Sequence, residues 1–309
     1  MTMFIFWILQ LLTIPALSPL MIGVVRKLKA RMQNRVGAGV LQPYRDLAKL
    51  FRKDEVVSED ASWIFRVAPY IIFATTLVVA ASIPLFAAPL SANPLSDFLS
   101  IVYLLALGVF FLALAGIDVG SAFGGFGSSR EATLAALAEG GIIFSLVSLA
   151  FAAHSTNLFQ IAAAVASLPL ISFAPIVLAF AAFLLALLAE TGRFPFDNPA
   201  THLELTMIHE AMILEYSGKR LALIEWASAN KFFIFIALAV NLFFPWGMAW
   251  TASLSAFAWG MFLFLAKALV LSVFVAVLES SIAKFRFFRL PDLLFASFVL
   301  SVIALSLII

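Results

Sequence analysis

Two ionisable side chains lie deep within long apolar segments of the sequence. Glu139 lies in the segment 131–153, and Lys267 lies in the segment 252–278. A charge at such a position is costly unless it is paired, hydrated or neutralised by a proton, and buried groups of this kind can relay protons. The alternative is a structural ion pair of Glu139 with Arg130 or Lys267. Proton relay is the favoured interpretation for Glu139.

A polar segment in the second half of the chain carries the densest set of ionisable side chains. Pro195 and Pro199 are expected to end one helix and to start another near Ala200. Glu204 and Glu215 would share one face of that helix, because successive helical residues are about 100° apart. The candidate proton-coupling residues of the whole chain are Glu139, Glu190, Asp197, Glu204, Glu215, Lys267 and Glu279.

A basic segment near the N-terminus leads into a predicted amphipathic helix. After Pro43, the spacing of Leu47, Leu50 and Phe51 predicts a short amphipathic helix that lies along the membrane surface. A basic loop that simply faces lipid headgroups is the alternative. The candidate partner-docking residues are Arg35, Asp46, Lys49, Arg130, Glu131, Arg193 and Tyr216.

Metal and catalytic chemistry is not expected on this chain. His209 and Glu210 begin a pattern like that of zinc proteases, but Ile213 stands where the second His is required. The chain has no Cys and three His, so it cannot by itself build a thiolate-held iron–sulfur cluster. A phosphate-binding loop is also missing from the sequence. Redox cofactors are therefore expected on partner proteins.

The elements that position these residues are predicted to be membrane-spanning helices. Of the 309 residues, 64% are hydrophobic and 12% are charged, and the mean hydropathy is +1.10, which excludes a water-soluble fold. Apolar stretches of about 20 residues match the thickness of a bilayer. The first is too long for a signal peptide and is expected to remain as a span. The prediction is a single all-α membrane domain over 1–309 with eight spans, at 3–25, 67–88, 98–117, 131–153, 171–191, 232–250, 252–278 and 291–309.

The distribution of basic residues predicts the orientation in the membrane. The loop 26–66 carries ten Lys and Arg residues, whereas the loops 89–97 and 154–170 carry none. By the positive-inside rule the basic side is cytoplasmic, so both termini are expected outside, in the plasma membrane of a prokaryotic cell. The net charge of +2 gives no indication of nucleic-acid binding. The long acidic loop between the fifth and sixth spans then lies in the cytoplasm.

With these motifs in order, the chain resembles the membrane subunit shared by respiratory complex I and the energy-converting group 4 nickel-iron hydrogenases, which include formate hydrogenlyase. The resemblance covers nearly the whole length. It rests on Asn34-Arg35-Val36-Gly37 with Leu41-Gln42-Pro43, on Arg130 with Glu139, on Glu190-Thr191 with Arg193 and Pro195-Phe196-Asp197, and on Glu215-Tyr216-Ser217-Gly218. Ala200-Thr201-His202, where complex I members carry more acids, is similar to the hydrogenase-4-like branch.

The resemblance implies a coupling role within a larger complex. Soluble hydrogenase large and small subunits and a ferredoxin-like subunit would hold the nickel-iron centre and iron–sulfur clusters and would dock on loops 26–66 and 192–230. The acids would then pass protonation changes to antiporter-like membrane subunits, with protons or sodium as the translocated ion. The altered acids argue against a conventional quinone site. The alternatives are a complex I subunit that lines a quinone chamber, a stand-alone ion transporter and a passive scaffold.

Overall fold

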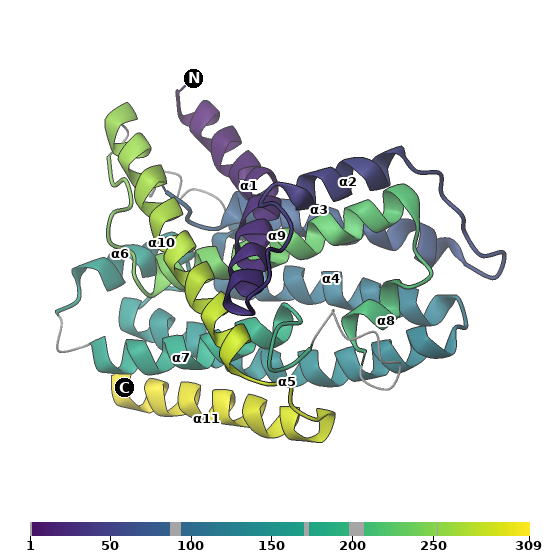
Figure 1. Cartoon of the computed structure of the whole chain (residues 1–309). Coiled ribbons are helices and arrows are strands. Elements are labelled where there is room, and N and C mark those ends of the chain that lie inside the picture. The colour runs from purple at the N-terminus through teal and green to yellow at the C-terminus, as the bar shows by residue number, and fades with distance from the viewer. Residues whose placement is uncertain (1, 87–93, 170–172, 198–206, 252) are drawn as a thin grey trace.

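The chain folds as a bundle of long helices (Figure 1). The computed structural model describes residues 2–86, 94–169, 173–197, 207–251 and 253–309, with side chains from residue 7 onward. Within these ranges there is no β-strand, and eight helices are long and apolar enough to cross a membrane, as predicted. They are α1 (Thr2–Met32), α3 (Trp63–Ser82), α4 (Phe98–Asp118), α5 (Ala122–Ala153), α7 (Phe173–Glu190), α9 (Gly218–Leu242), α10 (Leu254–Ser281) and α11 (Leu290–Ile308).

Three short helices lie at the two ends of the bundle. α2 (Gln42–Arg52) and α8 (His209–Ile213) lie at one end, and α6 (Leu158–Ser167) lies at the other. Both termini lie toward the end that carries α6 (Figure 1). α2 covers the residues after Pro43 for which a short helix was predicted, and Pro43 lies in its first turn, where a proline suits a helix because no hydrogen-bond donor is lost there. The basic segment and the acidic loop therefore meet at the same end.

α9 is the most enclosed of the eight long helices and forms the centre of the bundle. Its Asn230 joins the two helices on either side through buried side-chain hydrogen bonds. Ser18 of α1 donates to Asn230 Oδ1 over 2.6 Å, and Asn230 Nδ2 donates to Thr76 Oγ1 of α3 over 3.1 Å. Such polar contacts hold membrane helices in register, because an unpaired polar group in the apolar interior is costly.

Prolines inside α1 and α3 leave carbonyls that aromatic side chains satisfy. Pro19 and Pro69 have no N–H, so the carbonyls four residues earlier, at Pro15 and Phe65, lack their helical donor. Trp226 Nε1 donates to the Pro15 carbonyl over 2.8 Å, and the Tyr216 hydroxyl donates to the Phe65 carbonyl over 2.9 Å. Both donors come from the α8–α9 region, which is thereby fixed against α1 and α3.

α5 begins at Ala122, earlier than the predicted span 131–153, because the Gly-rich segment before Arg130 is also helical. Gly124 lies directly against the Gly116 carbonyl of α4, where a Cβ atom would come within 2.0 Å of the oxygen. Glycine thus allows the close approach of α4 and α5, as small residues do between membrane helices.

The chain between α7 and α9 also differs from the prediction. A helix from near Ala200 to Glu215 was expected, but in the described part of this segment α8 covers His209–Ile213 alone and α9 already begins at Gly218. Ile208, just before α8, is buried with a non-helical backbone. Burial of this segment against α4 and α5 therefore outweighs the helical periodicity. Residues 198–206, which include Glu204, lie outside the described residues.

Candidate functional site

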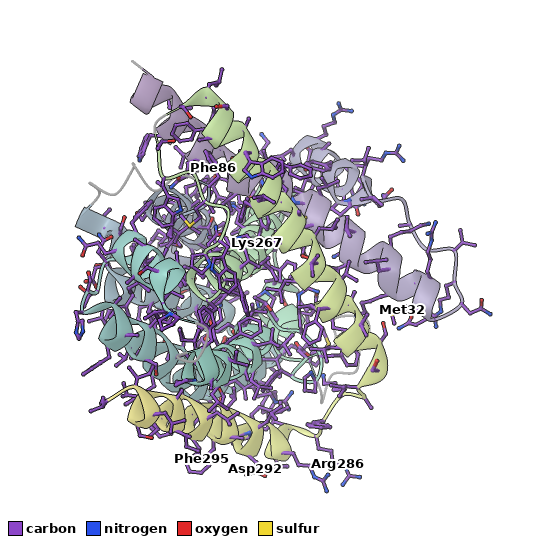
Figure 2. The ribbon with its side chains drawn as sticks, turned by 90° about the vertical axis from the view of Figure 1, so that its left-hand side faces the viewer. Met32, Phe86, Lys267, Arg286, Asp292 and Phe295 are labelled. Carbon is purple, nitrogen blue, oxygen red and sulfur yellow. The ribbon has the colours of Figure 1, made fainter. Side chains whose placement is uncertain are left out.

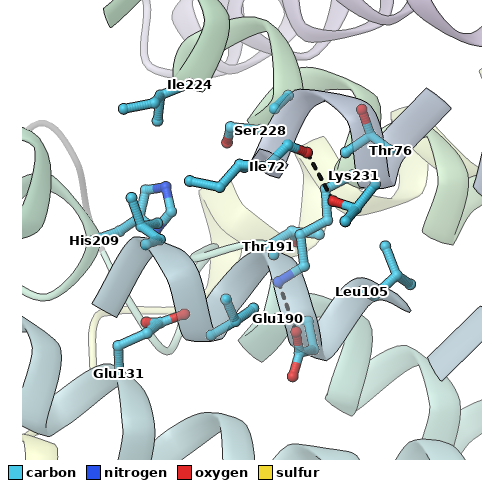
Figure 3. Close-up of a pocket in the computed structure, with 15 residues that line it drawn as sticks. Ile72, Thr76, Leu105, Glu131, Glu190, Thr191, His209, Ile224, Ser228 and Lys231 are labelled. Atoms are coloured by element: carbon cyan, nitrogen blue, oxygen red, sulfur yellow. Dashed lines mark hydrogen bonds and ion pairs between the residues drawn. The ribbon is translucent and has the colours of Figure 1, made fainter. Parts of the chain in front are cut away.

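A small, mainly apolar cavity that also holds ionisable side chains, here named the inner cavity, lies between α3, α4, α5, α7, α8 and α9. Its ionisable lining side chains are Glu131, Glu190, His209 and Lys231, and they point toward a common space (Figure 3). Lys231 Nζ lies 2.7 Å from Glu190 Oε2, with 16% and 6% of the two side chains exposed. The cavity volume of about 40 Å³ is enough for water. A buried ion pair beside water can exchange a proton with it.

Glu131 is a cavity residue rather than a residue of the outer surface. Its carboxylate lines the inner cavity together with Glu190, His209 and Lys231. We expected Glu131 among the partner-docking residues. Because α5 begins at Ala122, Glu131 instead lies inside a long helix and faces the bundle.

Glu139 lies two helical turns further along α5, next to a smaller cavity of about 10 Å³ that Glu190 also lines. Neither suggested ion-pair partner takes part: Arg130 Nη1 donates to the Met207 carbonyl over 2.9 Å, and Lys267 bonds elsewhere. Glu190 therefore lies between Lys231 and Glu139.

A second cavity of about 160 Å³, here named the loop cavity, lies under the segment that follows α7. One of its two buried acids is Glu279 of α10, which is 5% exposed, and the other is Asp197. Glu279 pairs with Lys29 Nζ of α1 at 2.6 Å and with Arg193 Nη1 at 2.7 Å. The Arg193 guanidinium also stacks over the Phe232 ring, 3.6 Å from its centroid. These contacts fix the segment after α7 to α1, α9 and α10.

Asp197 fixes the other end of the same segment. Lys284 Nζ, just after α10, donates to Asp197 Oδ1 over 2.9 Å, and the backbone N–H of His209 donates to Asp197 Oδ2 over 3.2 Å. Asp197 is 3% exposed. One carboxylate thus determines where α8 begins and, with it, where the His209 side chain enters the cavities.

A third cavity of about 270 Å³, here named the lateral cavity, lies between α1, α2 and α9. It is lined by Asp46, Leu47 and Leu50 of α2, and it shares Arg26 and Glu225 with the loop cavity. The loop cavity in turn shares His209, Thr191 and Ser228 with the inner cavity. Cavities that each contain ionisable side chains therefore follow one another from α2 to Glu139.

Two further predicted proton-coupling residues, Lys267 and Glu215, do not line these cavities. Lys267 lies about halfway along α10 (Figure 2) and donates to Asn241 Oδ1, the Phe244 carbonyl and the Val240 carbonyl over 2.9, 2.9 and 3.3 Å. It holds the end of α9. Glu215 is exposed, in the turn before α9.

The predicted docking residues divide into exposed and enclosed groups. Arg35 and Lys49 are exposed, and Asp46 accepts a 3.0 Å hydrogen bond from Gln42 Nε2 within α2. Arg193 lines the loop cavity and is partly enclosed. Tyr216 is buried, with its ring stacked 3.9 Å from that of Phe65. Burial raises the pKa of Tyr216 above its usual value, so its hydroxyl stays protonated and remains a donor.

Sequence reasoning missed His209 and Lys231 as members of the site. His209 was considered as a metal ligand, and Lys231 was placed at the edge of a span that was expected to start at residue 232. α9 begins at Gly218, directly after Ser217. If the sixth span had been predicted to begin there, Lys231 would have been placed within it. Among the described residues, no group of three or more His, Asp or Glu side chains could hold a metal ion.

Comparisons with known proteins agree with this architecture. The family model described as NADH dehydrogenase matches residues 4–309. Hydrogenase-4 component C of Escherichia coli (strain K12) is 36% identical over 306 residues, which cover 97% of this chain and 94% of that protein. Formate hydrogenlyase subunit 4 of the same organism is 33% identical over 291 residues, which cover 94% of this chain and 94% of that protein.

More distant similarity extends to other respiratory complexes. A subunit of the NADH-quinone oxidoreductase of Syntrophotalea carbinolica is 37% identical over 226 residues, which cover 67% of this chain and 66% of that protein. A chain in the structure of the membrane-bound sulfane sulfur reductase, an archaeal respiratory membrane complex, has a TM-score of 0.85 over 100% of both chains at 18% identity, which shows a shared fold. The resemblance inferred from the motifs is confirmed, and the chain belongs to the NADH dehydrogenase family.

Proposed function

We propose that this chain is the membrane subunit of an energy-converting hydrogenase of the formate hydrogenlyase type. It anchors a soluble redox arm at the end of the bundle that carries α2 and α8, and it couples the reaction of that arm to ion translocation. The observation that carries the proposal is the Lys231–Glu190 ion pair, enclosed between water-sized cavities that also hold Glu131 and Glu139.

The coupling follows from electrostatics in a medium of low dielectric. A change of charge or position in the segment after α7 alters the field at Glu131 and at the Lys231–Glu190 pair. Asp197 and Arg193 belong to that segment, and Asp197 accepts a hydrogen bond from the backbone N–H of His209, whose side chain lines the inner cavity beside these groups. The carboxylates respond by taking up or releasing protons. Glu139, further from the loop cavity, passes the proton onward to antiporter-like membrane partners.

The proposed partners follow from the resemblance to group 4 hydrogenases. The nickel-iron centre and the iron–sulfur clusters belong to the hydrogenase large and small subunits and to a ferredoxin-like subunit, which dock on the basic surface of 26–66 and on the segment around α8. That surface faces the cytoplasm of a prokaryotic cell, and both termini face outward across the plasma membrane. The relatives named as a hydrogenase-4 component and a formate hydrogenlyase subunit support this assignment.

The experiment is proton translocation by inverted membrane vesicles that contain the whole complex, supplied with formate. Glu190→Gln and Glu139→Gln are expected to keep assembly and hydrogen production while the protons moved per turnover fall roughly tenfold or more. Glu215→Gln, which changes an exposed acid, is the matched control. Unchanged proton translocation in both cavity variants would contradict the proposal.

A second candidate, a complex I type subunit with a quinone site, is favoured by the lateral cavity. That cavity is bordered by apolar side chains of α1 and α2 and leads to the loop cavity. The NADH-quinone oxidoreductase relative supports this reading. Photolabelling of the complex with an azido-quinone separates the two functions, since labelling of residues 42–52 or 207–230 supports a quinone site and labelling restricted to partner subunits contradicts it.

A further inference from the structure

His209 occupies a position that no other ionisable side chain shares within the described ranges. The inner cavity has four ionisable lining residues and the loop cavity has eight, and His209 alone belongs to both sets. Three uncharged residues, Thr191, Ile224 and Ser228, complete the shared wall. A proton that passes between the two cavities therefore meets the imidazole at their boundary.

The backbone around His209 holds this position. Its N–H donates to Asp197 Oδ2, and Asp197 is itself held by Lys284. Gly192 turns the chain after α7 with a φ of +57°, a conformation that favours glycine. A Cβ atom added at Gly192 would lie next to the Cβ atom of His209. The imidazole is thus placed by three segments that are distant in the sequence.

Acidic and basic side chains lie on both sides of the His209 ring. In the inner cavity these are Glu131 of α5, Glu190 of α7 and Lys231 of α9, and in the loop cavity they are Asp197, Lys29 of α1 and Glu279 of α10. Two cations of the loop cavity, Lys29 and Arg193, are paired with Glu279. Figure 3 shows the imidazole and the Glu131 carboxylate on the same side of the inner cavity.

We propose that His209 is the proton carrier between the loop cavity and the inner cavity. This inference rests on the proposed coupling function and adds the residue that connects its two halves. Imidazole suits the task because it takes up and releases protons near neutral pH and has two nitrogens that can face different sides. Hydroxyl side chains such as those of Thr191 and Ser228 order water but do not hold a proton charge at that pH.

The transfer step conserves protons and charge. A hydronium ion in the loop cavity gives its proton to one ring nitrogen, and an imidazolium forms. The imidazolium then releases the proton of its other nitrogen to water in the inner cavity or to the Glu131 carboxylate. The ring is left neutral in the opposite tautomer, and rotation of the ring restores the first one. No bond other than N–H and O–H bonds forms or breaks.

The test uses inverted vesicles with the whole complex and compares three variants. His209→Asn is expected to keep hydrogen production from reduced methyl viologen and to lower the protons moved per turnover roughly tenfold or more. Ser228→Ala, which changes the same wall without removing an ionisable group, is expected to stay within about twofold of the unmodified complex. Added imidazole is expected to restore part of the translocation in His209→Ala, whose truncated side chain leaves space in the wall.

The outcomes separate this inference from the proposed function. Wild-type translocation in His209→Asn, together with a loss in Glu190→Gln, would overturn the role of His209 and leave the relay standing. Unchanged translocation in both variants would overturn both. Equal losses in His209→Asn and Ser228→Ala, with no rescue by imidazole, would show that the wall is needed for its shape, and this result also overturns the proton-carrier role.

Discussion

The hydroxyl of Tyr216 donates a 2.9 Å hydrogen bond to the carbonyl of Phe65, the carbonyl that Pro69 leaves without its helical donor. The family motif around Tyr216 therefore has a structural role that its exposed neighbour Glu215 does not share. Tyr216 closes a gap in the backbone hydrogen bonds of α3 and ties the start of α9 to it.

Tyr216→Phe is expected to lower the free energy of unfolding by about 1 kcal/mol, because it leaves the Phe65 carbonyl without a donor. Thermal unfolding of the purified protein in detergent measures the change. The matched background is Pro69→Ala, which restores an N–H four residues after Phe65. In that background Tyr216→Phe should cost clearly less, and an equal cost in both backgrounds would show that the hydroxyl acts in some other way.

Glu279→Gln is expected to destabilise the protein by about 3 kcal/mol, because it leaves Lys29 and Arg193 without their shared buried carboxylate. The fraction of folded protein after a heat step in detergent reports the loss. The double variant Glu279→Gln with Lys29→Gln removes one of the two unpaired cations and should recover part of the lost stability. Glu59→Gln, at an exposed position, is the control. A double variant less stable than Glu279→Gln alone would contradict the ion-pair explanation.

Gly124→Ala is expected to destabilise the contact of α4 and α5 by about 1 to 3 kcal/mol, since the added Cβ would lie 2.0 Å from the Gly116 carbonyl oxygen. Gly125→Ala is a close control, because a Cβ there meets nothing within 4 Å. Alanine also favours a helix over glycine, so this variant should be neutral or slightly more stable. The midpoint of thermal unfolding distinguishes the two, and equal effects would argue against the close helix contact.

Lys267→Met is expected to lower stability without changing the protons moved per turnover. The ammonium donates to three oxygens at the end of α9, away from the inner, loop and lateral cavities, and methionine replaces none of these bonds. Unfolding in detergent and translocation in vesicles are both measured. A loss of translocation in fully assembled Lys267→Met complexes would return this lysine to the proton-coupling set.

The spans could be predicted from the sequence because each contains an apolar stretch long enough for the bilayer. The start of α9 could not be predicted in this way, because a hydropathy average counts every charged residue as unfavourable, whether or not its charge is paired within the bundle. Arg220 is paired with Glu55, and Lys231 is paired with Glu190, so both fit inside a helix that begins at Gly218. These partners come from distant segments, and their proximity is a property of the fold.

The candidate site was predicted in part for the same reason. Glu139 was identified because a carboxylate in an apolar stretch is conspicuous, and Glu190 because it belongs to the polar segment and the family motif after the fifth span. Glu131 and His209 were assigned other roles, since the sequence around them is polar and does not reveal that α5 extends back to Ala122 or that α8 turns inward. How deeply a residue lies within the bundle depends on how the helices pack against one another. The spacing of residues along a single helix does not determine this depth.

Infrared difference spectroscopy of the whole complex tests most directly whether the Lys231–Glu190 pair changes protonation during turnover. The spectra compare the oxidised and reduced states, in water and in deuterium oxide. The relay predicts a carboxylic acid C=O band that is sensitive to deuterium, that is absent in Glu190→Gln and that persists in Glu215→Gln. A difference spectrum in which Glu190→Gln keeps every carboxylic acid band of the unmodified complex would contradict it.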